Sequence, residues 1–301
     1  MSRAEPVTTP GPDTVAGGLR ELAPSAPSAP RAGMRLLRSE LGLVFRRRRN
    51  LAMLVVLAAV PILIGVALRV TRGGGNGGGP PLLSEATGNG VFLTFLALSV
   101  LLTLVLPLAT AIVSGDSVAG EAGYGTLRYL LAVPAGRSRL LAAKYVVIVA
   151  FGLASSAVVA VAALVTGLAL FPVGPVTLLS GTTVSLADGL LRLLYVVLYV
   201  GAAMAALGAI GLAISTLTEH PIGAIAAVAF LVVASQVVDN VPQFAVVHPY
   251  LPTHWWTSFD ALLRSPVATG DLLHGLLSFA AYLVIFGGFA WARFTSSDVS
   301  C

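Results

Sequence analysis

Long, uninterrupted apolar runs dominate the chain, and short polar stretches separate them. A hydrocarbon core of ~30 Å needs about 20 helical residues, so runs of this length predict helices that cross a membrane. Backbone groups inside a bilayer must be satisfied within the spanning structure, which favours helices here. Pro61 and Pro107 are expected to kink the first and second runs. Six runs are long enough to matter: 51–68, 91–114, 145–171, 189–217, 222–238 and 272–291.

The region before the first run divides into two parts. Residues 1–33 are rich in Pro, Ala, Ser and Thr, which predicts a disordered tail. About fifty residues precede the first apolar run, so this region does not have the form of a signal peptide. Residues 34–50 place apolar side chains on one helical face, which predicts an interfacial helix on the inner leaflet. A plain basic stop before the span is the alternative reading of its last residues, Arg46, Arg47, Arg48 and Arg49.

The proportion of charged residues indicates a membrane protein, and their distribution indicates its orientation. The chain is 56% hydrophobic and 10% charged, with a mean hydropathy of +0.91, whereas soluble domains carry roughly 25% charged residues. With six spans both termini lie on one side. That side holds fourteen of the eighteen Lys and Arg residues, so we expect it to be cytoplasmic and the membrane to be the plasma membrane. Basic charge beside a span indicates anionic lipid rather than nucleic acid.

Several chemistries are disfavoured by what the runs contain. No Asp, Glu, Lys or Arg lies near the middle of any run, and ion-coupled carriers need ionisable groups at that depth. No His-Glu-x-x-His or comparable catalytic motif occurs, so we expect no catalytic residue and no metal site in this chain. His248 and His254 are six residues apart with prolines between them, a poor spacing for a shared metal. We expect the uncharged polar residues of the runs to join helix to helix: Thr94, Ser99, Thr103, Thr110, Ser155, Ser156 and Gln236.

The connection between the last two runs, residues 239–271, is long for a loop without structure. Residues 237–247 are apolar enough to dip back into the membrane, and residues 255–263 are expected to form a short helix at the outer surface. One interpretation is an outer re-entrant hairpin. The other is an aromatic belt, in which Trp255 and Trp256 lie among the lipid headgroups.

The segment 115–144 is a long polar and basic stretch between two membrane-length runs. It reads D-x-V-A-G-E from Asp116 to Glu121, continues with G-T-L-R-x-L-L and P-x-x-R, and ends at Lys144. This string resembles the cytoplasmic segment of ABC-2 type transporter permeases, although Gly123 stands where many members have a second acid. The resemblance extends to the interfacial helix, six spans and outer hairpin, over about residues 34–292.

The resemblance implies an all-α membrane protein: an interfacial helix at 34–50, a six-span permease domain at 51–292 and a cytoplasmic C-terminus at 293–301. It implies that 115–144 carries a coupling helix that receives motion from a separate ABC ATP-binding subunit. ATP and Mg²⁺ would then be bound by that subunit, with no cofactor in this chain, and a second permease chain would complete the assembly. The residues that it assigns to coupling are Asp116, Glu121, Gly125, Thr126, Leu127, Arg128, Leu130 and Arg137.

The function expected from the resemblance is a non-catalytic permease subunit of an exporter, with an amphiphilic or hydrophobic substrate such as a drug, antibiotic or peptide. Translocation of a lipid or lipid-linked glycan is an alternative, and so is a membrane scaffold or sensor without transport. Glu121 is expected to pair with a basic residue of the ATPase, or alternatively to neutralise Arg128 or cap its segment. Arg46 to Arg49, Lys144, Trp255 and Trp256 are expected at the membrane interface.

Overall fold

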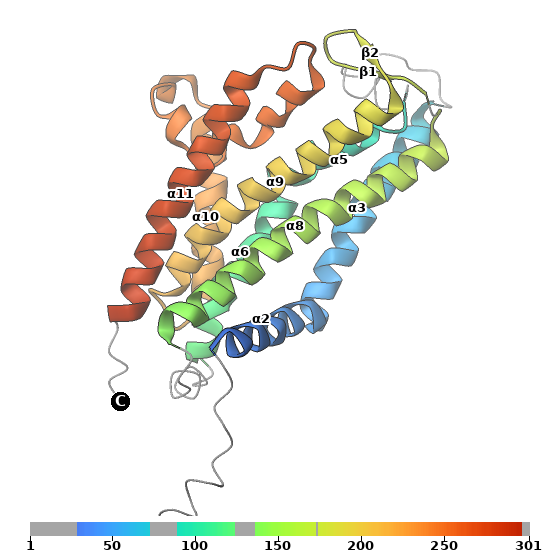
Figure 1. Ribbon diagram of the computed structural model, residues 1–301. Coiled ribbons are helices and arrows are strands. Elements are labelled where there is room, and N and C mark those ends of the chain that lie inside the picture. Colours follow the sequence, from blue (N-terminus) through green and yellow to red (C-terminus); the bar gives the residue numbers. More distant parts are fainter. Residues whose placement is uncertain (1–28, 73–88, 124–135, 173, 297–301) are drawn as a thin grey trace, which may run out of the picture.

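The computed structural model describes residues 29–72, 89–123, 136–172 and 174–296, which form an elongated bundle of helices (Figure 1). Five of these helices are long and apolar enough to cross a membrane alone, and one bent pair adds a sixth candidate span, so the described chain has the architecture of a multi-pass membrane protein. The predicted all-helical class is confirmed at this level. The single helices are α3 (Arg48–Arg72), α8 (Arg137–Leu170), α9 (Leu186–Ser215), α10 (Pro221–Asp239) and α11 (Thr269–Ser296), and the bent pair is α5 (Phe92–Thr103) with α6 (Val105–Gly123).

Helix α9 lies at the centre of the bundle. Of its most apolar stretch 72% is buried, against 17% for α3 and 11% for α11. Its contacts with α6, α8 and α11 supply much of the core, which includes Met204 and Leu207. The peripheral helices expose large apolar side chains, as expected where lipid replaces protein as the neighbour.

The helix of the second candidate span is broken, as expected from the presence of Pro107. Proline has no N–H and its ring displaces the carbonyl four residues earlier, which here belongs to Thr103. Helix α5 ends at that residue, and α6 leaves at an angle of 52°. The carbonyl oxygen of Thr103 instead accepts a hydrogen bond from the side-chain amide of Gln236 on α10. Pro61, in contrast, lies inside α3, which continues without interruption to Arg72.

The N-terminal amphipathic helix, α2 (Ala29–Arg46), starts earlier than predicted, because residues 29–33 belong to it rather than to the tail. It crosses the end of the bundle and packs on α8 (Figure 1). Phe45 approaches Phe151 of α8, with 6.0 Å between ring centroids. The helix thus packs on protein with one face, while Met34, predicted on that apolar face, is 68% exposed. We call this end of the molecule, marked by α2, the α2 end.

The opposite end of the bundle is closed by non-helical and short helical segments. Strands β1 (Val176–Thr177) and β2 (Thr183–Val184) form an antiparallel ribbon, with Val176 opposite Val184, that the sequence analysis did not predict. After α10 the chain forms three 3-10 helices: η1 (Pro242–Phe244), η2 (His248–Tyr250) and η3 (His254–Leu263). The last of these matches the short helix expected at 255–263. We call this end, formed by β1–β2 and η1–η3, the cap end.

Close backbone approach and hydrogen bonds hold the cap end together. A Cβ on Gly167 of α8 would lie 1.9 Å from the carbonyl oxygen of Gly90, so only glycine fits where these segments touch. The guanidinium of Arg192 donates to the carbonyl oxygens of Leu262 and Arg264, which fixes the end of η3 to the start of α9. The cap end is therefore joined to the central helix by side-chain bonds to backbone carbonyls.

The uncharged polar residues of the spans mostly do not join helices as predicted. Ser99, Thr103 and Thr110 donate to carbonyls one turn earlier in their own chain segment, the usual behaviour of Ser and Thr inside helices. The hydroxyls of Thr94 and Ser155 are buried without a hydrogen-bond partner in the described structure. Gln236 forms a clear bond between helices, and Ser156 a longer one, of 3.4 Å, to the Val197 carbonyl oxygen.

Candidate functional site

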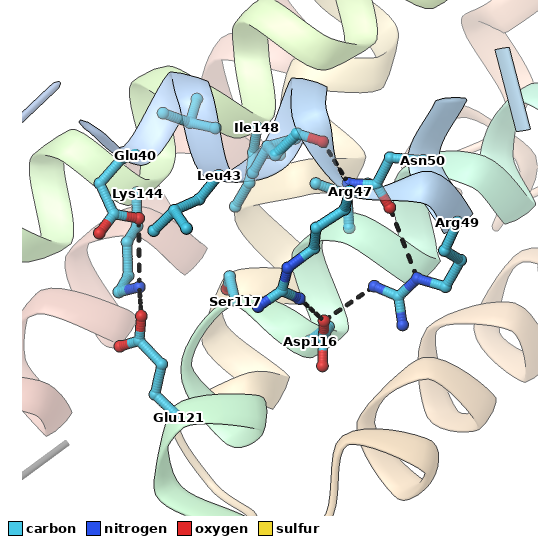
Figure 2. Close-up of a pocket in the computed structure, with 13 residues that line it drawn as sticks. Glu40, Leu43, Arg47, Arg49, Asn50, Asp116, Ser117, Glu121, Lys144 and Ile148 are labelled. Carbon is cyan, nitrogen blue, oxygen red and sulfur yellow. Dashed lines mark hydrogen bonds and ion pairs between the residues drawn. The ribbon is translucent and has the colours of Figure 1, made fainter. Parts of the chain in front are cut away.

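Six charged side chains, three acidic and three basic, gather at the α2 end, where α2, α3, α6 and α8 meet (Figure 2). They come from segments far apart in the sequence, and their formal charges cancel. We call this set the charge cluster: Glu40, Arg47, Arg49, Asp116, Glu121 and Lys144.

Lys144 is the centre of one half of the charge cluster. Its ammonium lies 2.5 Å from a carboxylate oxygen of Glu121 on α6 and 3.5 Å from one of Glu40 on α2. The lysine side chain is only 3% exposed, and a buried ammonium without partners costs several kcal/mol. The two carboxylates balance that cost, so Lys144 ties three helices to one another. It was predicted at the membrane interface, and in the structure protein covers its ammonium.

Asp116 is the centre of the other half. Its Oδ2 atom accepts from the guanidinium of Arg47 at 2.7 Å and from that of Arg49 at 2.8 Å. These arginines flank the junction at which α2 ends and α3 begins, while Asp116 lies on α6. The junction itself is closed by Asn50, which is buried and whose amide donates to the carbonyl oxygen of Val44 at 2.9 Å. The α2–α3 corner is thus held against α6.

The side chains of the charge cluster enclose a cleft of about 50 Å³, with Val113, Val147 and Ile148 forming its apolar part (Figure 2). A site of that size accommodates no more than a few water molecules, whereas pockets for organic ligands measure hundreds of Å³. The charge cluster is therefore too closed to be a binding site for a transported molecule. Its geometry suits a joint that keeps helices in register.

A hydroxyl clamp holds α6 to α9 beside the charge cluster. The hydroxyl of Ser215 donates to the carbonyl oxygen of Gly115 at 2.8 Å and accepts from the backbone N–H groups of Val118 and Ala119 at 3.1 and 2.9 Å. The serine side chain thus inserts into the backbone ladder of α6. It is completely buried, which makes this contact part of the core and not a surface bond. Sequence analysis did not single out Ser215, because nothing in its local pattern marks it.

The structure places three of the predicted coupling residues and does not describe the other five. Asp116 and Glu121 lie near the end of α6, and both have ionic partners within this chain. Glu121 was expected to pair with the ATPase, to neutralise Arg128 or to cap its segment; the structure pairs it with Lys144, and Arg128 lies outside the described residues. Arg137 is elsewhere, at the start of α8, where its guanidinium donates to the Thr295 carbonyl oxygen at the end of α11. The remaining predicted coupling residues lie outside the described part of the chain: Gly125, Thr126, Leu127, Arg128 and Leu130.

The other residues predicted at the membrane interface differ in exposure. All four residues from Arg46 to Arg49 are exposed, and two of them bond to Asp116. Trp256 is 3% exposed and packs in the core. Trp255 is partly buried and donates to the carbonyl oxygen of Pro249 at 3.0 Å.

Glu40 was also missed, and the sequence contained a signal for it. It lies one turn from both Leu36 and Val44, on the face by which α2 packs on the bundle. A lone acid on the buried face of an amphipathic helix requires a cationic partner. Lys144, the only lysine of the chain, was a candidate for that partner, because no other side chain was expected to pair with it.

The two histidines near the start of the cap end lie beside the same carboxylate. His254 contacts Asp239 at 2.6 Å, and His248 lies 3.9 Å from the same carboxylate oxygen. Among the residues that the structure describes, no group of three or more His, Cys, Asp or Glu side chains is arranged to hold a metal ion. The three side chains instead fasten the start of the cap end to the end of α10.

Residues 82–300 match a protein family described as a protein of unknown function, DUF2705. The chain belongs to this family. No curated protein matches the chain. The region shared with DUF2705 contains Asp116, Glu121 and Lys144, whereas Glu40, Arg47 and Arg49 precede it. The charge cluster therefore connects the family region to the N-terminal helices of this chain.

Proposed function

We propose that this DUF2705 protein is the membrane subunit of an ATP-driven exporter of the ABC-2 type, coupled to a separate ATP-binding subunit. Its substrate would be amphiphilic or hydrophobic, and a second permease chain would complete the pathway. The motif from Asp116 to Lys144 supports the family assignment, and the arrangement of helices is compatible with it.

The observation that carries the proposal is the way the end of α6 is held. Segment 124–135, which contains most of the motif, directly follows α6 and directly precedes the loop residue before α8. A force applied to that segment reaches α6 and α8 first. From there Lys144 and Asp116 connect it to α2 and α3, and Ser215 connects it to α9. Coupling by rigid-body motion needs this kind of contiguous, two-way connection.

The distribution of charge supports a mechanism driven from outside the membrane. In every described candidate span, Asp, Glu, Lys and Arg lie near an end and none lies in the middle. A carrier driven by an ion gradient generally has ionisable groups at membrane depth. The α2 end, with the arginines of α2 and α3, is the cytoplasmic side in this proposal, and the chain resides in the plasma membrane.

The cap end would then face the outside, and residues 239–271 would be the outer hairpin of the ABC-2 arrangement. Packing of η3 on α9 and α11 supports this reading, because it connects the hairpin to α9, which Ser215 clamps to α6 near the α2 end. Under this proposal Trp255 and the exposed apolar residues of the hairpin, such as Val246, border the outer leaflet.

Purification of the full chain from its own membrane, with an affinity tag at the C-terminus, tests this function. We expect mass spectrometry to identify a copurified subunit that binds and hydrolyses ATP. Reconstitution with this chain should raise its ATP turnover, and ionophores that collapse ion gradients should not change that increase. Movement of cargo by the chain alone down an ion gradient would contradict the proposal.

The position of the coupling segment can be tested with two single-cysteine variants. In a Cys301→Ser background, Ala122→Cys should react with a membrane-impermeant maleimide only from the cytoplasmic side, since it follows Glu121 at the α2 end. Val246→Cys, at an 86% exposed position of the cap end, should react only from the opposite side. The reverse pattern would overturn the orientation.

A further inference from the structure

A second cavity, much larger than the cleft in the charge cluster, lies at the cap end. It has a volume of about 480 Å³ and lies between α11 on one side and η2 and η3 on the other. Ligand pockets are typically 300–1,000 Å³, so this one has room for part of an organic molecule. Nothing in the proposed export mechanism uses it. We call it the α11 groove.

The walls of the α11 groove are aromatic rings held in place by their polar ends. Trp255 donates its indole N–H to the Pro249 carbonyl oxygen at 3.0 Å, and the Tyr282 hydroxyl donates to the Tyr250 carbonyl oxygen. The Trp255 ring also stacks on His274, with centroids 5.5 Å apart. Because the indole and the phenol bond to the backbone, they present mainly ring carbon to the cavity.

Polarity changes along the length of the groove. His274 and Ser278 lie one turn apart near the cap end of α11, and neither side chain has a hydrogen-bond partner in the described structure. Beyond them the α11 lining consists of Ala281, Tyr282 and Ile285, with the tyrosine hydroxyl already bonded. The α11 groove is thus polar near the cap end and apolar towards the middle of α11.

The depth of the α11 groove matches one leaflet of a bilayer. From His274 to Ile285 the helix rises about 16 Å at ~1.5 Å per residue, and half of a hydrocarbon core of ~30 Å is about 15 Å. Helix α11 is also the least buried of the candidate spans, so the groove opens on a side that the bilayer covers. A bilayer lipid would therefore reach it without leaving its own leaflet.

We propose that the α11 groove binds a lipid of the leaflet at the cap end, with its headgroup against His274 and Ser278 and one acyl chain lying along Ala281 towards Ile285. The acyl chain covers apolar surface that the protein leaves open, and the headgroup supplies hydrogen-bond partners for the His274 imidazole and the Ser278 hydroxyl. This inference depends on the membrane location of α11 but not on ATP-driven export, so either proposal can fail without the other.

Photolabelling of the full chain in vesicles of phosphatidylethanolamine and phosphatidylglycerol tests the inference. Two probes are used in trace amounts: phosphatidylglycerol with a diazirine at the end of an acyl chain, and phosphatidylglycerol with a diazirine in the headgroup. We expect the chain-end probe to label the peptide around Ile285 and the headgroup probe to label the peptide around His274. Excess unlabelled phosphatidylglycerol should suppress both.

Ala281→Trp, which fills the groove, should lower both labels about tenfold, since exclusion of two methylene groups is enough for that change. Ala280→Trp is the matched control, because it places the same ring on the preceding residue of α11, which is exposed but does not line the groove. It should leave labelling unchanged.

Equal labelling of the two tryptophan variants, or reversed positions of the two probes, would overturn the proposal. Crosslinks from this peptide to a second copy of the chain, in place of lipid, would also overturn it. If Ala281→Trp fails to fold, Ser278→Leu serves in its place. It should reduce the headgroup label severalfold, and an unchanged headgroup label would again contradict the inference.

Discussion

The two ends of this protein are held together by different chemistry. At the α2 end, paired charges connect four helices: Lys144 between two carboxylates, and Asp116 between two arginines. At the cap end, side chains such as Arg192 and Trp255 donate to backbone carbonyls, and aromatic rings fill the space between them. Backbone carbonyls do not change with pH or partner, whereas charge pairs can be broken and remade. The contrast indicates a fixed cap at one end and an adjustable joint at the other.

The charge cluster can be broken most severely at Lys144. Lys144→Ala leaves Glu40 and Glu121 buried without their shared cation, which should cost about 3–5 kcal/mol because an uncompensated buried charge remains. Arg46→Ala removes an exposed cation of the same region and should change stability by no more than about 0.5 kcal/mol. Thermal unfolding in detergent measures both. Equal midpoints for the two variants would show that the buried cluster contributes little.

The cap end should respond most strongly to changes of side-chain volume where its backbone segments touch. Gly167→Ala forces a Cβ against the Gly90 carbonyl oxygen and should destabilise the protein by about 1–3 kcal/mol, the usual cost of overpacking. Gly287→Ala, at a helical position with open space, should be neutral or stabilise by up to about 1 kcal/mol. The same unfolding assay applies, and a stabilised Gly167→Ala protein would refute the close approach.

The bend between α5 and α6 lies between the α2 end and the cap end. The contribution of Gln236 to its stability can be tested by a double-mutant cycle. Gln236→Leu leaves the Thr103 carbonyl without a donor and should cost about 1 kcal/mol. In a Pro107→Ala background the backbone N–H of residue 107 can supply that bond, so the same substitution should cost measurably less. Identical costs in both backgrounds would mean that Gln236 does not compensate for the proline.

The weakest effect expected is at the exposed half of the charge cluster. Asp116→Asn removes two ion pairs to half-exposed arginines and should cost about 1 kcal/mol or less, and this difference from the parent should shrink at high salt. Asp260→Asn breaks only the exposed pair with Arg264 on η3 and should cost no more than about 0.5 kcal/mol. Unfolding midpoints at low and high salt compare the two. A salt-independent loss in Asp116→Asn would argue against an electrostatic role.

The sequence predicted the spans well because hydrocarbon imposes a length and a composition on any helix that crosses it. It also predicted the break at Pro107, since that effect is local to the backbone. It did not predict that Gln236 would satisfy the freed carbonyl, because the two residues are 133 positions apart. Local rules define elements, whereas contacts between distant elements depend on packing.

The same distinction explains the outcome at the candidate site. Asp116 and Glu121 were found from their motif, but their partners Arg47 and Lys144 were not predicted, because no local pattern places α2 and α8 beside α6. Ser215 could be recognised only from the packed structure, whereas Glu40 had a local signal in its place on the buried face of α2. Lys144 and Trp256 were expected at the membrane interface because both residue types are common there, and only their neighbours in space reveal that they are buried by protein.

ATP hydrolysis by the reconstituted complex shows whether a separate ATP-binding subunit drives this chain. Asp116→Lys places a cation beside Arg47 and Arg49 and opens the joint between α6 and the α2–α3 corner, and the two half-exposed arginines can turn towards solvent. We expect the ATP-binding subunit still to copurify in the normal ratio, while its stimulation by this chain falls about fivefold, within the range of measured coupling energies. Undiminished stimulation with Asp116→Lys, or a chain that purifies from its own membrane with no ATP-hydrolysing subunit, would contradict the proposed coupling.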